Sequence, residues 1–220
     1  MHNPWFDLPG RAPFVLPFDA MNVKAFNARV APVQRIHLEA MPEPFLGRFE
    51  ARVVVLMLNP GFPADGVDVP ESAAHVARLR QSLATGVVPH LHLVPSAEGN
   101  GAAWWKRTTR ALVAATSAAV VAEQLLTLEF SPYHSIQFAH GHLRFPSQDF
   151  TFHLLRAALA RGAEVVVARG FEWWVSAVPE LYDYARLHRP RSPQQSAMSA
   201  GNLGTESFTQ VVSALSGGPR

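Results

Sequence analysis

The sequence contains no cysteine, which excludes disulfide bonds, thiolate metal sites and cysteine nucleophiles. It also lacks the GxGxxG and GxxxxGK[ST] phosphate-binding loops, the HExxH metal motif and the GxSxG nucleophile elbow. No cofactor and no metal are therefore expected. Two histidine pairs, His90 with His92 and His140 with His142, leave a metal site as a minor alternative, because imidazoles two residues apart can reach one cation.

Long apolar runs are missing as well. The N-terminus shows no signal-peptide pattern, and the run Ala111 to Ala122 is too short and too interrupted to span a bilayer. These absences predict a cytoplasmic protein without a membrane partner. The oligomeric state stays open.

The sequence also lacks a large excess of either positive or negative charge, since the net charge is only +2. Binding of nucleic acid through phosphate neutralisation alone usually needs a stronger basic excess. The basic residues are clustered in one place, where Arg186, His188, Arg189 and Arg191 fall within six residues. This cluster is either a solvated loop or a surface that contacts phosphates.

What the sequence does have is a composition suited to packing, with 48% hydrophobic and 16% charged residues. Its 220 residues suit one domain, residues 1–220, with an N-terminal arm and helix at 1–50 and the core at 51–215. The stretch Pro63 to Gly101 is a long excursion, which we expect to form a lid.

Apolar runs rich in β-branched residues alternate with stretches of helical spacing, as expected for strands buried on both faces of a parallel sheet. Strands are expected at Ala51 to Leu58, Leu125 to Phe130, Glu164 to Ala168 and Tyr184 to His188. Helices are expected from Asp19 to Ile36 and at Ala73 to Leu83, Ala102 to Thr116, Gln148 to Ala160, Phe171 to Val178 and Thr205 to Leu215. The alternation predicts an α/β protein, a three-layer α/β/α sandwich with a central, mainly parallel four-stranded sheet.

Ligands of such sheets bind beyond the carboxyl ends of the strands. The first core strand ends in VLMLNPGF at Val55 to Phe62, the second is followed by EFSPYHS at Glu129 to Ser135, and the last by PRSPQQS at Pro190 to Ser196. Together with EGNGAAWWKRTTRAL at Glu98 to Leu112, these motifs resemble the mismatch-specific and single-strand-selective branches of the uracil-DNA glycosylase superfamily. The resemblance covers about Ala51 to Gly204 in the same order.

The resemblance implies hydrolysis of an N-glycosidic bond in DNA, single-stranded or damaged, after a nucleotide has been flipped out of the stack. Asn59 would orient the attacking water, and an amide is a weaker base than a carboxylate. The base would be held by Pro60, Gly61, Phe62, Glu129, Phe130, Tyr133 and His134. The DNA backbone would be contacted by Arg189, Arg191, Ser192 and Gln194. The alternative for Asn59 is a turn residue that satisfies its own backbone.

The family places a histidine after the last strand to stabilise the anionic base. Aligning PRSPQ puts Leu187 at that position, and a shift of one residue restores His188, which is therefore the catalytic candidate. His134 is a second candidate from the neighbouring strand. Either histidine could instead be a structural residue that bonds a loop carbonyl.

Glu129 stands where a related glycosylase presents an asparagine. An ionised carboxylate offers only acceptors, so it would face the lone pairs of uracil O4, and this predicts a protein that does not read uracil in the usual way. A base with two adjacent donors, or a Glu129 protonated through burial, would suit the position better. In the alternative register, Glu129 makes an ion pair with Arg169.

A competing function is a protein of the same fold that binds nucleic acid, a nucleotide or a free base without cleaving it, because fold does not determine function. An Asn59 that faces an open, basic cleft would favour the glycosylase. An Asn59 plugged by Arg or Trp side chains would favour the binding protein.

Overall fold

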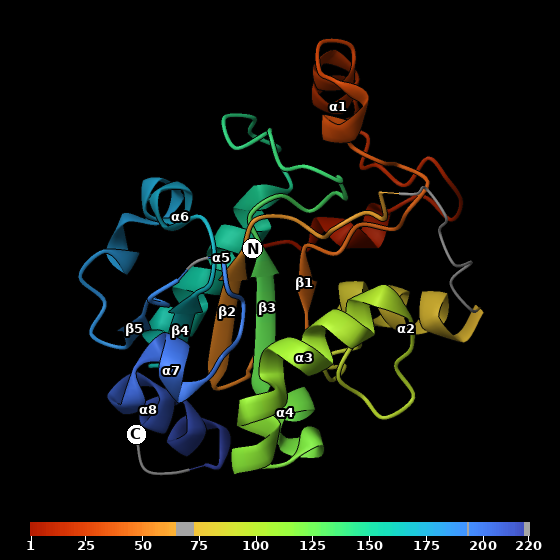
Figure 1. Ribbon diagram of the computed structural model, residues 1–220. Helices are drawn as coiled ribbons and strands as arrows, with labels where there is room; N and C mark the ends of the chain where they lie inside the picture. The colour runs from red at the N-terminus through yellow and green to blue at the C-terminus, as the bar shows by residue number, and fades with distance from the viewer. Residues whose placement is uncertain (65–72, 193, 218–220) are drawn as a thin grey trace.

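The computed structural model describes residues 1–64, 73–192 and 194–217. A five-stranded sheet in the order β1-β3-β2-β4-β5 lies at its centre (Figure 1). Strands β2, β3, β4 and β5 run parallel, and β1 is antiparallel to β3. The strands comprise β1 Phe45–Leu46, β2 Val53–Met57, β3 Leu125–Glu129, β4 Glu164–Val167 and β5 Leu187–His188.

The predicted count of four strands was wrong, because the structure adds β1 at one edge of the sheet. Phe45 and Leu46 pair with Leu128 and Thr127. A strand of two residues has no periodicity that a sequence pattern could reveal. At the opposite edge, β5 contains only the last two residues of the expected strand Tyr184 to His188.

Helices cover both faces of the sheet. Successive side chains of a strand point to opposite faces, so the apolar residues of β2 need packing partners on both. Val54 and Leu56 belong to a core cluster that contains buried residues of α5 and α6, whereas Val53, Val55 and Met57 pack with residues of α3, α4, α7 and α8. The helices comprise α1 Ala20–Asn27, α2 Ala73–Thr85, α3 Gly99–Ala115, α4 Ala118–Gln124, α5 Gln148–Ala160, α6 Phe171–Ala177, α7 Ala200–Leu203 and α8 Thr205–Leu215.

The expected bounds of α5 and α8 are confirmed, and those of α6 differ by one residue. The helix expected from Asp19 to Ile36 ends at Asn27, and a short 3-10 helix follows at Pro32–Gln34. The apolar run Ala111 to Ala122 contains the end of α3 and most of α4, which are separated at Thr116 and Ser117. None of the helices in the described ranges has the length and apolarity needed to cross a membrane.

Candidate functional site

β2 and β4 are neighbours in the sheet. The connection that follows β2 leads to β3 on one side of β2, and the connection that follows β3 leads to β4 on its other side. β2 pairs with β3 on one side and with β4 on the other, so the topological switch point of the sheet lies between β2 and β4, and ligands of α/β sheets bind beyond the carboxyl ends of the strands at such a point. Gly170, with φ +73°, closes in on the end of β2, because a Cβ at this position would lie 2.4 Å from Leu58 Cδ2. A side chain is excluded there. The carboxyl end of β2 is therefore the place to look for a site.

Asn59 follows β2 at this end of the sheet and is half-buried. Its Nδ2 donates to Pro60 O at 2.8 Å, to Ser135 Oγ at 3.0 Å and to Ser135 O at 3.3 Å. The Ser135 hydroxyl donates to Gln137 O at 3.3 Å, so its lone pair faces the Asn59 amide. A flipped amide would put Oδ1 against two carbonyl oxygens. Oδ1 therefore points away from them and accepts no hydrogen bond from a described residue.

The Asn-Pro-Gly loop is braced by two histidines. His134 has Nδ1 at 2.8 Å from Gly61 O and Nε2 at 2.8 Å from Met41 O, so both ring nitrogens face backbone carbonyl oxygens. His37 stacks on Phe62 with ring centroids 3.7 Å apart and planes 9° apart. One face of Phe62 is covered by this stack. The loop is thus held in place by residues from two distant segments.

Glu129 ends β3 opposite Met57 and is only 5% exposed. Its Oε2 is buried without a hydrogen-bond partner. Burial, and then the charge of Glu43, raise the pKa of Glu129 well above its ordinary value, although Arg169 opposes the shift. No ion pair joins Glu129 to Arg169 within 4.0 Å, so the alternative register is not observed among the described contacts. A neutral Glu129 carries one donor and one acceptor.

Glu43, which the sequence patterns did not single out, lies beside Glu129. Its backbone N–H donates to Pro132 O at 3.0 Å, and both carboxylate oxygens lie 3.4 Å from His92 Nε2. The charges of His92, His134 and His75 outweigh burial and lower the pKa of Glu43 to about 2. The surroundings therefore act in opposite senses on the two carboxyl groups, favouring the ionised form of Glu43 and the neutral form of Glu129.

Two of the expected base contacts point into the core instead. Phe130 is fully buried and packs edge-on against Trp174, and its ring lies beneath the Arg144 guanidinium. The Tyr133 hydroxyl donates to Asp19 Oδ2 at 2.7 Å in a buried network. Neither side chain is available to a ligand in this arrangement, because each belongs to the packing behind the sheet.

The structure does not bring His188 to Asn59. His188 Nε2 lies 2.7 Å from Oε2 of Glu164, the first residue of β4, which pairs with Val53 at the start of β2. Asn59 lies six residues beyond Val53, or roughly 20 Å along a strand. The imidazole therefore points toward the amino ends of the strands. Of the two histidine candidates, His134 is the one at the site.

The loop after β5 is ordered by Asn202. Its side chain accepts from Ser192 N at 3.0 Å and donates to Gln195 O at 2.7 Å. Arg189 is exposed, and its guanidinium lies over the Phe171 ring, 3.8 Å from the ring centroid. Arg191 and Gln194 are exposed on the same loop, and Ser192 is half-buried. Pro193 of the PRSPQQS motif lies outside the described residues, as do residues 65–72 of the predicted lid.

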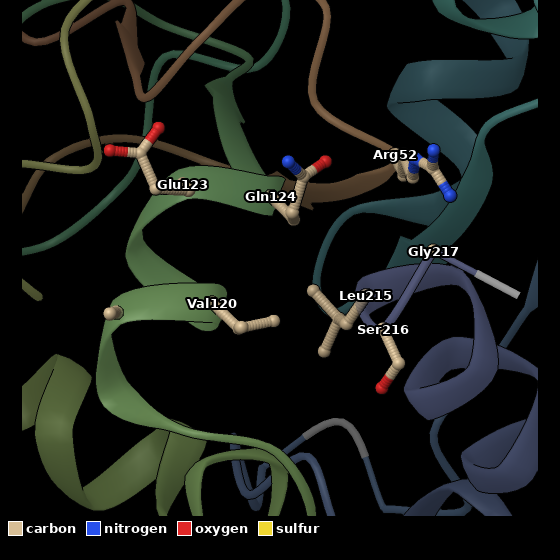
Figure 2. Close-up of a pocket in the computed structure, with 8 residues that line it drawn as sticks. Arg52, Val120, Glu123, Gln124, Leu215, Ser216 and Gly217 are labelled. Atoms are coloured by element: carbon tan, nitrogen blue, oxygen red, sulfur yellow. The ribbon is translucent and has the colours of Figure 1, made fainter.

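A hollow of about 320 Å³ lies at the opposite end of the central strands from Asn59, at the amino ends of β2 and β3 (Figure 2). Val120 and Leu215 point toward one another across it, and Glu123 points away. The lining comprises Arg52, Ala119, Val120, Glu123, Gln124, Leu215, Ser216 and Gly217. None of the predicted site residues is among them, so this hollow is separate from the Asn59 site.

No group of three or more metal-binding side chains is arranged to hold an ion within residues 1–64, 73–192 and 194–217. His90 Nε2 and His140 Nε2 instead lie at hydrogen-bonding distance from the hydroxyls of Thr127 and Ser131, at 3.0 and 2.8 Å. Comparison of the chain with protein-family models, with curated proteins and with solved structures found no match.

Sequence reasoning missed three residues at the site: His37, Glu43 and Ser135. Ser135 is the last residue of the motif EFSPYHS, and its hydroxyl marks it as a possible hydrogen-bond partner for a site residue. Glu43 stands in MPEP, which reads as a helix end. His37 carries no local signal that would distinguish it from a surface histidine.

Proposed function

We propose that this chain is a three-layer α/β/α sandwich of the uracil-DNA glycosylase type, which binds DNA, holds a flipped nucleobase at the carboxyl ends of β2 and β3 and hydrolyses its N-glycosidic bond. The order of the motifs along the chain supports this assignment. The position of Asn59 after β2, a strand that borders the topological switch point of the sheet, supports it further, since ligands of α/β sheets bind at such points.

The orientation of the Asn59 amide is the observation that carries the proposal. Its N–H groups are bonded to Pro60 O and Ser135 Oγ, which leaves Oδ1 as an acceptor for a water molecule. A water that donates one hydrogen to Oδ1 has a lone pair directed at the sugar carbon C1′. An amide accepts a proton poorly, so the main contribution of Asn59 is to orient the water, and the rate is expected to be modest.

The departing base needs a flat platform and a donor for its negative charge. Phe62 offers one ring face, since the other is covered by His37. Gly61 is exposed and has no side chain, so the loop backbone can approach the base closely. A neutral Glu129 supplies an O–H donor, which replaces the role that the resemblance assigned to His188.

The loop after β5 suits contact with phosphates. Arg189 and Arg191 are exposed, and neither makes an ion pair within the described residues. Asn202 fixes the loop backbone, so little ordering would be needed on binding. Contacts of this kind position the DNA and carry no sequence information.

A second candidate function is a protein that binds a nucleobase or nucleotide without cleaving it. The absence of a carboxylate at position 59 favours this alternative, because the site then has no strong base beside the expected water. The two functions share the base site and differ in whether the C1′–N bond breaks.

Formation of abasic sites distinguishes the two functions. The protein is incubated with oligonucleotides that each carry uracil, hypoxanthine, xanthine or a mismatch, and abasic sites are cleaved with alkali. We expect release from at least one of these, and we expect Asn59→Ala to slow that release by about 100-fold or more. Asn22→Ala is the matched control, because Asn22 also donates to a backbone carbonyl, Arg144 O, but on α1. Binding without any base release would establish the second function.

A further inference from the structure

Glu43 and Glu129 are two buried carboxyl groups on adjacent segments. Glu43 N donates to Pro132 O at 3.0 Å, and Glu129 N donates to Pro44 O at 2.9 Å, so the two segments run side by side at the edge of the sheet. The residues are 7% and 5% exposed. Two carboxyl groups that share a dry site cannot both ionise at low cost. One proton should therefore be retained by the pair.

The surroundings decide which residue keeps that proton. Glu43 has His92 Nε2 at 3.4 Å from both of its oxygens, and His134 and His75 also favour its ionised form. Glu129 has no cation within 4.0 Å among the described residues, and its Oε2 has no partner. An unpaired buried charge is much more costly than an unpaired neutral group. The geometry thus leaves the proton on Glu129.

The other groups packed around the pair either favour a neutral Glu129 or oppose it less strongly than burial favours it. Burial is the largest cause that raises the pKa of Glu129, the charge of Glu43 is the second, and Arg169 from the loop after β4 lowers it. His90, whose ring centroid lies 6.2 Å from that of His92, has a pKa lowered to about 3 by burial and is neutral. It therefore supplies no positive charge that would ionise Glu129.

We propose that Glu43 is a positioning residue that keeps a proton on Glu129, so that Glu129 presents an O–H donor and a carbonyl acceptor to a base with a ring N–H beside a carbonyl oxygen, as in uracil and hypoxanthine. This inference rests on the base site of the proposed function. As the C1′–N bond breaks, its electron pair passes to the base, and the Glu129 O–H hydrogen-bonds the carbonyl oxygen that carries the charge. The oxygen of the attacking water forms the new bond to C1′ and one of its protons passes to solvent, while the base leaves as the anion that Glu129 hydrogen-bonds; no bond forms to the protein.

The proton can be followed directly by NMR of protein labelled with ¹³C at the glutamate carboxyl groups. In the wild type, the Glu129 signal should titrate well above the ordinary range. In Glu43→Gln, the like charge is gone, so the midpoint of the Glu129 titration should fall by about 1 pH unit or more. Glu43→Asp keeps the negative charge and should restore the midpoint. Glu50→Gln, at an exposed glutamate ahead of β2, is the control.

Binding of free uracil supplies the second measurement, with 1,3-dimethyluracil as the probe that lacks both ring N–H groups. Wild-type affinity should fall as the pH rises through the titration of Glu129, and Glu43→Gln should move this fall to lower pH. In Glu129→Gln, the amide keeps one donor and one acceptor at every pH, so uracil binding should persist and lose its pH dependence. 1,3-Dimethyluracil should bind weakly to the wild type and to both variants.

The inference is overturned if Glu43→Gln leaves the Glu129 titration unchanged, or if Glu129→Gln no longer binds uracil. Failure of the proposed function gives a different result. A protein that releases no base from any oligonucleotide is not a glycosylase, yet the titration and the binding of free uracil still report on the carboxyl pair.

Discussion

Ser135 offers a graded test of how Asn59 works. The Ser135 hydroxyl is one of two close acceptors for Asn59 Nδ2, at 3.0 Å, and the other is Pro60 O at 2.8 Å. Ser135→Ala removes the first and leaves the second, so the amide keeps its orientation but is held less firmly. A neutral hydrogen bond contributes about 1 kcal/mol net, which corresponds to roughly a fivefold loss in the rate of base release.

The assay is single-turnover base release by the wild type, Ser135→Ala, Asn59→Ala and the double variant. Asn59→Ala removes the water-binding oxygen and should cost about 100-fold or more. Because Ser135 acts only through Asn59, the double variant should be no slower than Asn59→Ala alone. Ser213→Ala, at an exposed serine of α8, is the control. Independent, multiplicative losses in the double variant would refute the reasoning, as would a Ser135→Ala rate equal to that of the wild type.

Three further predictions concern residues away from the base. Substitution of both Arg189 and Arg191 by glutamine should weaken the binding of all single-stranded DNA sequences equally. It should also reduce the slope of log affinity against log salt concentration by about 1.4. A loss of affinity confined to some sequences would contradict phosphate contact. His188→Ala should lower the unfolding temperature by about 4–8 °C, from a loss of about 2 kcal/mol, and leave base release by the folded protein unchanged; slower release by the folded variant would return this residue to the mechanism. His90 and His140 are buried, with pKa values lowered to about 3 and about 4 against 6.5 when unfolded, so the unfolded chain takes up protons first as the pH falls. Their stabilisation is complete above about pH 6.5 and should decline by about 2 kcal/mol per histidine on reaching pH 5, which urea unfolding of the wild type and of a variant with glutamine at both positions can measure.

Periodic elements could be predicted from the sequence because their signal is local. The apolar run of β2 and the helical spacing of α5 and α8 each lie within one segment, and the structure confirms them. The motif after β2 placed Asn59 at the end of a central strand for the same reason. The order of the strands across the sheet, and the two-residue strand β1, have no such local signal.

The direction of single side chains depended on tertiary contacts. The sequence indicated that three site candidates follow or end strands: Phe130, Tyr133 and His188. In the structure, Phe130 packs against Trp174 and Tyr133 bonds Asp19 in the core. His188 contacts Glu164 toward the other end of the sheet. Their partners are 24 to 114 residues away in the sequence. A pattern of neighbouring residues contains no information on such partners.

The sequence by itself determined the fold class, the position of Asn59 after a buried strand and the presence of Glu129 at the end of the next one. Only the tertiary structure raised the pKa of Glu129, because burial and the nearby Glu43 charge arise when the segment before β1 packs alongside β3. The first acceptor of the Asn59 amide, Pro60 O, is its neighbour in the sequence, and only the tertiary structure supplied the second, since Ser135 lies 76 residues away. Chemistry at this site depends on distances between segments, and those distances are set by folding.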